Sequence, residues 1–377
     1  MTAAPPPASI CLLRTSALGD VTHVVPLIHT LRSGFPQARL TWIVGKLEYK
    51  LVGDLPDIEF VVFDKSLGLE GLRTVRLALE GRRFDVLLHM QVALRANVLS
   101  LGVHARRRIG YDHARAKDLH GLTVNERIPA RSGEHVLDAI GSFAEPLGLQ
   151  QTSVRWDLPI PVEAAAWAAD QLPGDAPWLL INAASSHSVR NWFAAGYAAV
   201  ADHAQQALGW RVALTGGPSK LERHLGDAIH THMRSTPADL IGRDTLKRAL
   251  ALYQRAAALL TPDAGPMHMA NAVGTPIIGL HAASNPARSG PYSDRRWCVN
   301  RYAAAAHKFM GRAVEDLPWG TKIERPRGDG PDPYRRCDRA SRSAGSGAPP
   351  RLAALLRLRG AKSARAIVVV RLLFNQA

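Results

Sequence analysis

The sequence lacks the features that mark a membrane protein or a disulfide-stabilised one. It contains no run of about 18 uncharged apolar residues, which is the length that a membrane-spanning helix needs. Segment 1–9 is rich in Pro and small residues, and no basic residue precedes the short apolar stretch 10–13, so no signal peptide is predicted. The three cysteines are too few for a disulfide framework, and no pair has the spacing of zinc ligands. We therefore expect a cytoplasmic protein.

Several motifs of metal and phosphate chemistry are also missing. The sequence has no D-x-D pair, which metal-dependent sugar transferases use to hold their ion, and no H-E-x-x-H zinc motif. It has no G-x-x-x-x-G-K-[ST] phosphate loop and no G-x-S-x-G nucleophile turn. His230 and His232 are two residues apart, which is the wrong spacing for one face of a helix. No bound metal or cofactor is predicted.

Positive charge is the feature in excess, and it is concentrated at one end. The formal net charge is +15, and the 53 residues from Arg325 onward hold 12 Lys and Arg against 3 Asp and Glu. The mildly basic remainder suits anionic ligands and the inner face of an anionic membrane, although surplus arginine on a soluble surface is the simpler explanation. No helix-turn-helix, zinc finger or aromatic RNA-binding platform appears, so no nucleic-acid partner is predicted.

Strand-like and helical segments alternate along the chain in two similar halves. In the first half, apolar strands are predicted at 10–14, 39–44, 60–63 and 85–89, and helices at 21–32, 49–52, 72–79 and 137–147. In the second half, strands are predicted at 178–182, 210–215, 239–241, 257–261 and 276–280, and helices at 194–208, 220–233, 246–255 and 266–273. This alternation predicts parallel, doubly wound sheets that bind ligands at the carboxyl ends of their strands.

Two breaks in the pattern predict the domain boundaries. A polar, irregular stretch fills 106–131, and a break rich in Pro and polar residues at 150–161 separates a first domain, 1–155, from a second, 156–325. Segment 326–377 is different, with many arginines among Pro, Gly, Ser and Ala. One hypothesis is a reading-frame shift near Arg325, which is excluded if the alternative frames encode no acidic helix. The other is a basic tail that contacts a membrane.

The turn after the first predicted strand, Arg14-Thr15-Ser16-Ala17-Leu18-Gly19-Asp20, is the first candidate site. Its small residues let a ligand approach the backbone. Asp20, at the start of the following helix, could accept a proton from a sugar hydroxyl. A helix cap explains the same aspartate, and the turn alone does not decide between the two.

Two turns of the second half have the residues of a nucleotide site. Segment Asn182–Trp192 carries Ser185, Ser186 and Arg190, which could grip a pyrophosphate, or equally form a Ser-rich turn with a solvated arginine. Thr215-Gly216-Gly217-Pro218 ends the next strand, and Glu222 follows it. Glu222 could bind a ribose diol, although a surface glutamate in the first turn of a helix is the commoner case.

The segment Thr261–His268 is the most informative one. A strand ends at Asp263, and a glycine turn leads into a helix that carries His268. Free amides at the start of that helix would bind phosphate, and Asp263 could hold sugar hydroxyls. The alternative is a capped helix with a packed histidine. We favour the ligand site because this turn repeats the architecture of the Ser185–Arg190 turn.

Together with Pro286-x-Arg288-x-Gly290-Pro291-Tyr292, these turns resemble glycosyltransferase family 9, the ADP-heptose:lipopolysaccharide heptosyltransferases. The resemblance covers about residues 8 to 325, and the R-T-S-x-L-G-D start is most similar to heptosyltransferase I. It implies a GT-B fold, in which two Rossmann-like domains face each other across a cleft. It also implies an inverting, metal-independent transfer from ADP-L-glycero-β-D-manno-heptose to a Kdo sugar on lipid A.

The resemblance also implies the roles of individual residues. Asp20 matches the general base of the family. The donor is implied to contact Ser185, Ser186, Arg190, Glu222, Asp263, Ala264, Gly265 and His268. The sequence departs from the family in having Ser185 and Ser186 where threonines are common, and Arg190 where lysine is common, which leaves the exact donor open.

The acceptor site is less specified. The candidate acceptor ligands are Arg14, Arg95, Arg108, Arg115 and Lys117, and the last four are more often solvated charges. Contact with the inner membrane would bring the enzyme to a lipid-anchored acceptor. Two alternative functions stay open, namely transfer from another nucleotide-sugar in surface polysaccharide synthesis and a non-enzymatic regulator of saccharide biosynthesis.

Overall fold

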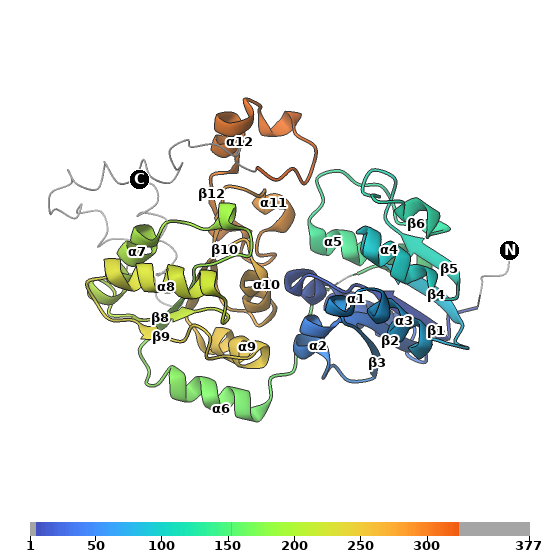
Figure 1. Ribbon diagram of the computed structural model, residues 1–377, viewed down its shortest axis with the longest axis horizontal. Coiled ribbons are helices and arrows are strands. Elements are labelled where there is room, and N and C mark those ends of the chain that lie inside the picture. Colours follow the sequence, from blue (N-terminus) through green and yellow to red (C-terminus); the bar gives the residue numbers. More distant parts are fainter. Residues whose placement is uncertain (1–4, 152, 324–377) are drawn as a thin grey trace. The chain divides into compact units, whose positions relative to one another are not determined.

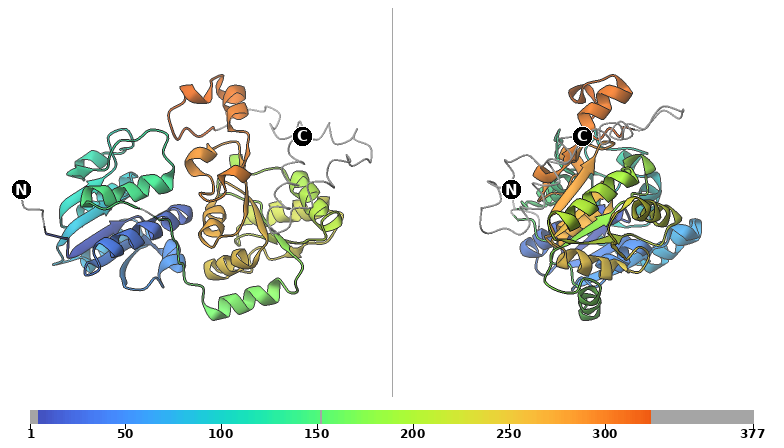
Figure 2. Two further views of the ribbon diagram at one scale, coloured as in Figure 1. Left: turned by 180° about the vertical axis from the view of Figure 1, so that it is seen from behind. Right: turned by 90° about the vertical axis from the view of Figure 1, so that its left-hand side faces the viewer.

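The computed structural model describes residues 5–151 and 153–323. The chain divides into two compact units, and the division falls between Pro159 and Ile160. Each unit is built on a six-stranded sheet of parallel neighbours, so the predicted pair of Rossmann-like α/β units is confirmed (Figure 1; Figure 2). The predictions for 326–377 lie outside the described residues.

The first sheet has the strand order β3-β2-β1-β4-β5-β6. Its strands are β1 (Ser9–Leu13), β2 (Arg39–Gly45), β3 (Ile58–Phe63), β4 (Phe84–His89), β5 (Ala105–Gly110) and β6 (Glu126–Arg127). Its helices are α1 (Leu18–Gly34), α2 (Lys46–Val52), α3 (Leu69–Ala78), α4 (Leu94–Leu101) and α5 (Val136–Gly141), with 3₁₀ turns at Lys65–Leu67, His120–Leu122 and Ser142–Leu147. Because Leu13 of β1 pairs with His89 of β4, the turns that follow these two strands are neighbours.

The core of the first unit explains where its helices lie. The central strands are apolar along their length, which is the pattern of strands buried on both faces. On one face, Leu13 and Leu87 pack against Val75 of α3 and Leu99 of α4 in a single cluster. The outward sides of α3 and α4 therefore belong to the same surface of this unit.

The second sheet has the order β12-β11-β10-β7-β8-β9. Its strands are β7 (Trp178–Asn182), β8 (Arg211–Thr215), β9 (Ala238–Asp239), β10 (Ala258–Pro262), β11 (Ile277–His281) and β12 (Val299–Asn300). Its helices are α6 (Val162–Gln171), α7 (Ala194–Gln206), α8 (Lys220–His232), α9 (Leu246–Arg255), α10 (Gly265–Ala272), α11 (Pro286–Ser289) and α12 (Tyr302–Met310), with 3₁₀ turns at Ser188–Arg190, Arg295–Trp297 and Val314–Asp316. β7 and β10 pair directly, so the turns after them also lie side by side.

The prediction that 106–131 is irregular is partly wrong. It contains most of β5 and all of β6. Three consecutive arginines hide β5 from a hydrophobicity pattern, but the Arg107 guanidinium pairs with Glu126 of β6 at 2.7 Å. The helix predicted at 137–147 also changes type, since α5 ends at Gly141 and a 3₁₀ segment containing Pro146 follows. Among the described residues, no helix is both long and apolar enough to cross a membrane.

Candidate active site

The turn between β1 and α1 holds Asp20 in two local interactions. Ala17 occupies the N-cap position, and its backbone N–H donates to the Asp20 carboxylate at 3.2 Å. The guanidinium of Arg14 forms an ion pair with the same carboxylate. The capping explanation is thus correct in part, because Asp20 closes the first turn from its third position. Its side chain stays 32% exposed, so the carboxylate is also open to a ligand.

The surroundings of Asp20 make it a stable anion. Burial raises the pKa of Asp20, but the Arg14 guanidinium, His23 and the Ala17 N–H outweigh this effect and lower the pKa to about 2. Asp20 is therefore ionised at neutral pH and is free to take a proton. Arg14 also donates to the backbone oxygen of Met90, so this predicted acceptor ligand is held within the turn.

Gln91, which the sequence analysis missed, holds this turn in shape. Its Oε1 accepts from the Thr15 backbone N–H at 2.8 Å and from the Thr15 hydroxyl at 2.9 Å. Its Nε2 donates to the Ser16 hydroxyl at 3.1 Å. The only signal for Gln91 in the sequence is its place just after a buried strand, β4, whose partner β1 precedes Asp20.

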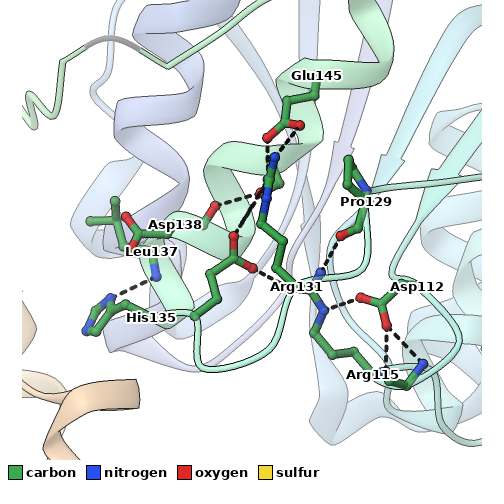
Figure 3. Close-up of polar contacts among 11 residues, drawn as sticks. Asp112, Arg115, Pro129, Arg131, His135, Leu137, Asp138 and Glu145 are labelled. Atoms are coloured by element: carbon green, nitrogen blue, oxygen red, sulfur yellow. Dashed lines mark hydrogen bonds and ion pairs between the residues drawn. The ribbon is translucent and has the colours of Figure 1, made fainter.

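Two of the candidate acceptor ligands are engaged inside the first unit. Arg108 donates to the backbone oxygens of Ser100, Val103 and Thr123 at 2.8, 2.5 and 2.7 Å. Arg115 forms ion pairs with Asp112 and, at 2.6 Å, with Glu134, and it donates to the Pro129 oxygen (Figure 3). An acceptor would have to compete with these contacts for either guanidinium group.

Arg131 extends the network that contains Arg115. Its Nη2 donates to Glu145 Oε2 at 2.9 Å, and its Nη1 donates to the Ser142 hydroxyl at 2.9 Å (Figure 3). These contacts tie the loop before α5 to the 3₁₀ segment after it. By contrast, the two remaining candidates, Arg95 on α4 and Lys117 in the loop after β5, have exposed side chains.

A buried pair of histidines lies at the end of β4. His89 Nε2 and His120 Nδ1 lie 2.9 and 3.0 Å from the same Asn97 Oδ1. His120 Nε2 accepts from the Tyr111 backbone N–H at 3.1 Å, so this ring is neutral and protonated on Nδ1. Burial lowers the pKa of His89 to about 3 and that of His120 to about 4. The pair is thus a neutral structural element at neutral pH.

In the second unit, the structure brings together two motifs that are far apart in the sequence. Arg190 Nη1 donates to the Asp263 backbone oxygen at 2.9 Å and lies 3.3 Å from the Asp263 carboxylate. The Ser289 hydroxyl donates to this carboxylate at 3.3 Å, and His268 Nε2 lies 4.0 Å from it. Burial raises the pKa of Asp263, but the nearby His281, Arg190 and His268 lower it by more than that, so the net shift is downward. Asp263 is therefore the buried anion around which this site is organised.

The Ser185 turn and the start of α10 expose groups suited to an anion. Ser185 is buried, its N–H donates to Asn191 Oδ1 at 2.6 Å, and its hydroxyl accepts from the His187 N–H at 3.3 Å. Ser186 is exposed. No side chain caps α10, whose N-cap is Ala264 and whose first residue is Gly265. The first amides of this helix can therefore bind a ligand anion.

Glu222 has a clear structural role. Its carboxylate accepts from the Gly217 N–H at 2.7 Å and from the Ser219 hydroxyl at 2.5 Å, and Ser219 in turn caps α8. A Cβ at Gly217 would lie 3.1 Å from Glu222 Oε2, so glycine lets the turn fold over the carboxylate. In the part of the chain that the structure describes, no group of three or more His, Cys, Asp or Glu could hold a metal ion.

Comparison with known proteins identifies the family. The family model described as glycosyltransferase family 9 (heptosyltransferase) matches residues 72–316. The chain is 36% identical over 318 residues to the lipopolysaccharide core heptosyltransferase OpsX of Haemophilus influenzae, covering 84% of this chain and 91% of that protein. The chain belongs to glycosyltransferase family 9. The resemblance inferred from the turns is thus confirmed.

Solved structures have the same fold as this family 9 glycosyltransferase. A family 9 glycosyltransferase of Veillonella parvula matches with a TM-score of 0.69 and 24% identity, over 78% of this chain and 86% of that one. The Escherichia coli heptosyltransferase WaaC, solved with ADP, matches with a TM-score of 0.61 and 17% identity, over 75% of this chain and 90% of that one. The predicted GT-B type of α/β fold is confirmed.

Proposed function

We propose that this glycosyltransferase moves heptose from ADP-L-glycero-β-D-manno-heptose to a Kdo sugar of the lipopolysaccharide inner core, with inversion and without a metal. The name of the Haemophilus influenzae relative supports the lipopolysaccharide core as the destination. The Escherichia coli heptosyltransferase has also been solved with ADP-2-deoxy-2-fluoro heptose, which supports the donor class. The observation that carries the proposal is the contact of Arg190 with Asp263, because it gathers the two anion-binding turns at one edge of the second sheet.

The second unit, 156–325 in our assignment, would bind the donor. The amides of Ala264 and Gly265 and the hydroxyls of Ser185 and Ser186 would hold the pyrophosphate. Arg190 would stabilise the charge that grows on the ADP leaving group, while Asp263 holds its guanidinium in place. His268 would complete this side of the site, and Glu222 would bind the ribose diol.

The first unit, 1–155 in our assignment, would bind the acceptor at the turn after β1. Asp20 takes the proton of the acceptor hydroxyl as the oxygen of that group attacks the anomeric carbon and the bond to ADP breaks. A carboxylate with a pKa of about 2 is a weak base, so proton transfer is expected late in the reaction, when the attacking hydroxyl has become acidic. Arg14 fixes the carboxylate and sets its basicity.

The test follows ADP release from ADP-heptose in the presence of Kdo₂-lipid A. Turnover that requires both substrates supports the proposal, and Asp20→Asn should lower kcat by about 10² to 10⁴-fold while leaving donor binding intact. Other nucleotide-sugars offered in the same assay address the alternative donor that Ser185, Ser186 and Arg190 leave open. Efficient transfer from another nucleotide-sugar, with none from ADP-heptose, would refute the proposed donor.

A further inference from the structure

Helix α4 presents an apolar ridge to solvent. Leu94, Val98 and Leu101 recur at the i, i+4 and i+7 positions of one helix face and are 53%, 45% and 63% exposed. The opposite side of α4 buries Ala96 and Leu99 in the core of the first unit. The helix thus has apolar side chains on its outer face as well as on its inner one, which is unusual for a surface helix.

The loop after β5 widens this ridge. Leu119 and Leu122 in that loop are 67% and 80% exposed. The loop is fastened to the first turn of α4, because the Leu94 N–H donates to the Asp118 carboxylate at 3.2 Å and Asn97 Nδ2 donates to the Asp118 backbone oxygen at 2.7 Å. We call the five exposed side chains the α4 patch: Leu94, Val98, Leu101, Leu119 and Leu122.

The contacts of Arg108 hold the far end of the loop in the same way. Arg108 Nη2 donates to the Ser100 backbone oxygen at 2.8 Å, and Arg108 Nε donates to the Thr123 backbone oxygen at 2.7 Å. Ser100 precedes Leu101, and Thr123 follows Leu122, so both ends of the α4 patch are anchored. Its apolar groups are held in place without an apolar partner over them, as their exposure shows.

Cations flank the α4 patch on both sides. Arg95 of α4 and Lys117 of the loop are exposed, as are Arg73 and Arg76 of α3. α3 lies on the same face of the sheet, and a Cβ built on Gly102, next to the end of α4, would lie 3.8 Å from the Arg76 Cβ. The acidic side chains among these groups are fewer, namely Glu70, which lies 3.9 Å from Arg73, and Asp118. The rim of the patch is therefore positive.

We propose that the α4 patch docks on the surface of an anionic lipid bilayer. Apolar side chains on one helix face enter the boundary between headgroups and acyl chains, and flanking Arg and Lys extend their charged ends to the anionic headgroups. The proposal rests on the proposed function, in which the acceptor is lipid-anchored. A second copy of the chain fits the patch less well, because a two-fold contact would bring Arg95 and Lys117 close to the same residues of the partner.

The experiment measures co-sedimentation of the full-length chain with phosphatidylcholine vesicles, prepared with and without phosphatidylglycerol. The triple variant Leu94→Gln/Val98→Gln/Leu101→Gln is compared with Leu47→Gln/Val162→Gln/Met310→Gln, which alters three other exposed apolar residues. We expect the first triple variant to bind anionic vesicles roughly tenfold less tightly or worse, and the control to bind like the original chain. Arg95→Gln and Lys117→Gln should each weaken binding about fivefold, on anionic vesicles only.

Equal vesicle binding by both triple variants would overturn the proposal. So would a patch-dependent dimer in solution whose loss leaves vesicle binding unchanged. If the α4 triple variant fails to fold, the two cation variants decide, and unchanged binding by both overturns the proposal. Vesicle binding needs no turnover, and turnover on a detergent-solubilised acceptor should be the same for the original chain and the two triple variants, so failure of the patch is distinguishable from failure of the proposed reaction.

Discussion

Acidification is expected to weaken the first unit through its buried histidine pair. His89 and His120 are 0% exposed, and both donate to Asn97 Oδ1. Burial lowers their pKa values to about 3 and about 4, from an ordinary value of 6.5. The unfolded chain therefore binds more protons than the folded one when the pH lies between the folded pKa values and 6.5. Stability is complete above pH 6.5 and is lost as the pH falls from there toward the folded pKa values.

The size of the effect follows from the pKa shifts. At about pH 5.5, roughly one unit below the pKa of an unfolded histidine, protonation of each histidine in the unfolded chain lowers the free energy of unfolding by about 1.4 kcal/mol relative to about pH 7.5. The pair therefore costs about 3 kcal/mol, a large share of the stability of a typical domain. Glu126, whose pKa is lowered from 4.5 by its contact with Arg107, acts only at lower pH. Burial raises the pKa of Glu48 in the same unit, so a comparison with a variant that lacks the two histidines isolates their share.

The assay is hydrogen exchange of peptides from β1 and β4, corrected for intrinsic exchange rates, at the two pH values. The double variant His89→Gln/His120→Gln loses hydrogen bonds at both pH values, but its free energy of opening should change by about 3 kcal/mol less between them than that of the original chain. His113→Gln, which alters an exposed histidine, should keep the original slope. If the double variant retains the slope of the original chain, the assigned protonation states are wrong.

Three further predictions concern the reaction itself. Asp20→Asn should lower kcat by about 10² to 10⁴-fold with little change in ADP affinity by calorimetry, and an active variant would exclude Asp20 as the base. Arg14→Met should raise the pKa of Asp20, because the guanidinium lowers it. The acid limb of the kcat/KM profile should then move to higher pH, and an unmoved limb would contradict the role of Arg14. Arg190→Ala should leave the Asp263 carboxylate buried without its guanidinium partner, so both the ADP affinity and the melting temperature should fall. Arg190→Lys should recover part of each. An equal loss in the two variants would show that a positive charge at this position is not enough.

Local sequence patterns predicted the elements whose own residues decide their structure. Segments with an apolar centre, such as 85–89 and 178–182, became central strands, because a strand covered on both faces is mostly apolar. Segment 246–255 matched α9 at both ends, since Thr245 caps it and its apolar residues have helical spacing. The order of the turns was specific enough to predict the family.

Partners that lie far apart in the chain were beyond such patterns. Strand β5 has a polar sequence because it contains three arginines. It can form a strand because Glu126 and backbone oxygens, which only the fold brings close, pair with two of them. The role of Gln91 depends on the pairing of β1 with β4, and the contact of Arg190 with Asp263 spans 73 residues. The sequence by itself therefore determined which segments are strands, helices and ligand-binding turns, because these depend on neighbouring residues. Tertiary structure alone decided which charges face each other, because an ion pair depends on distance in space.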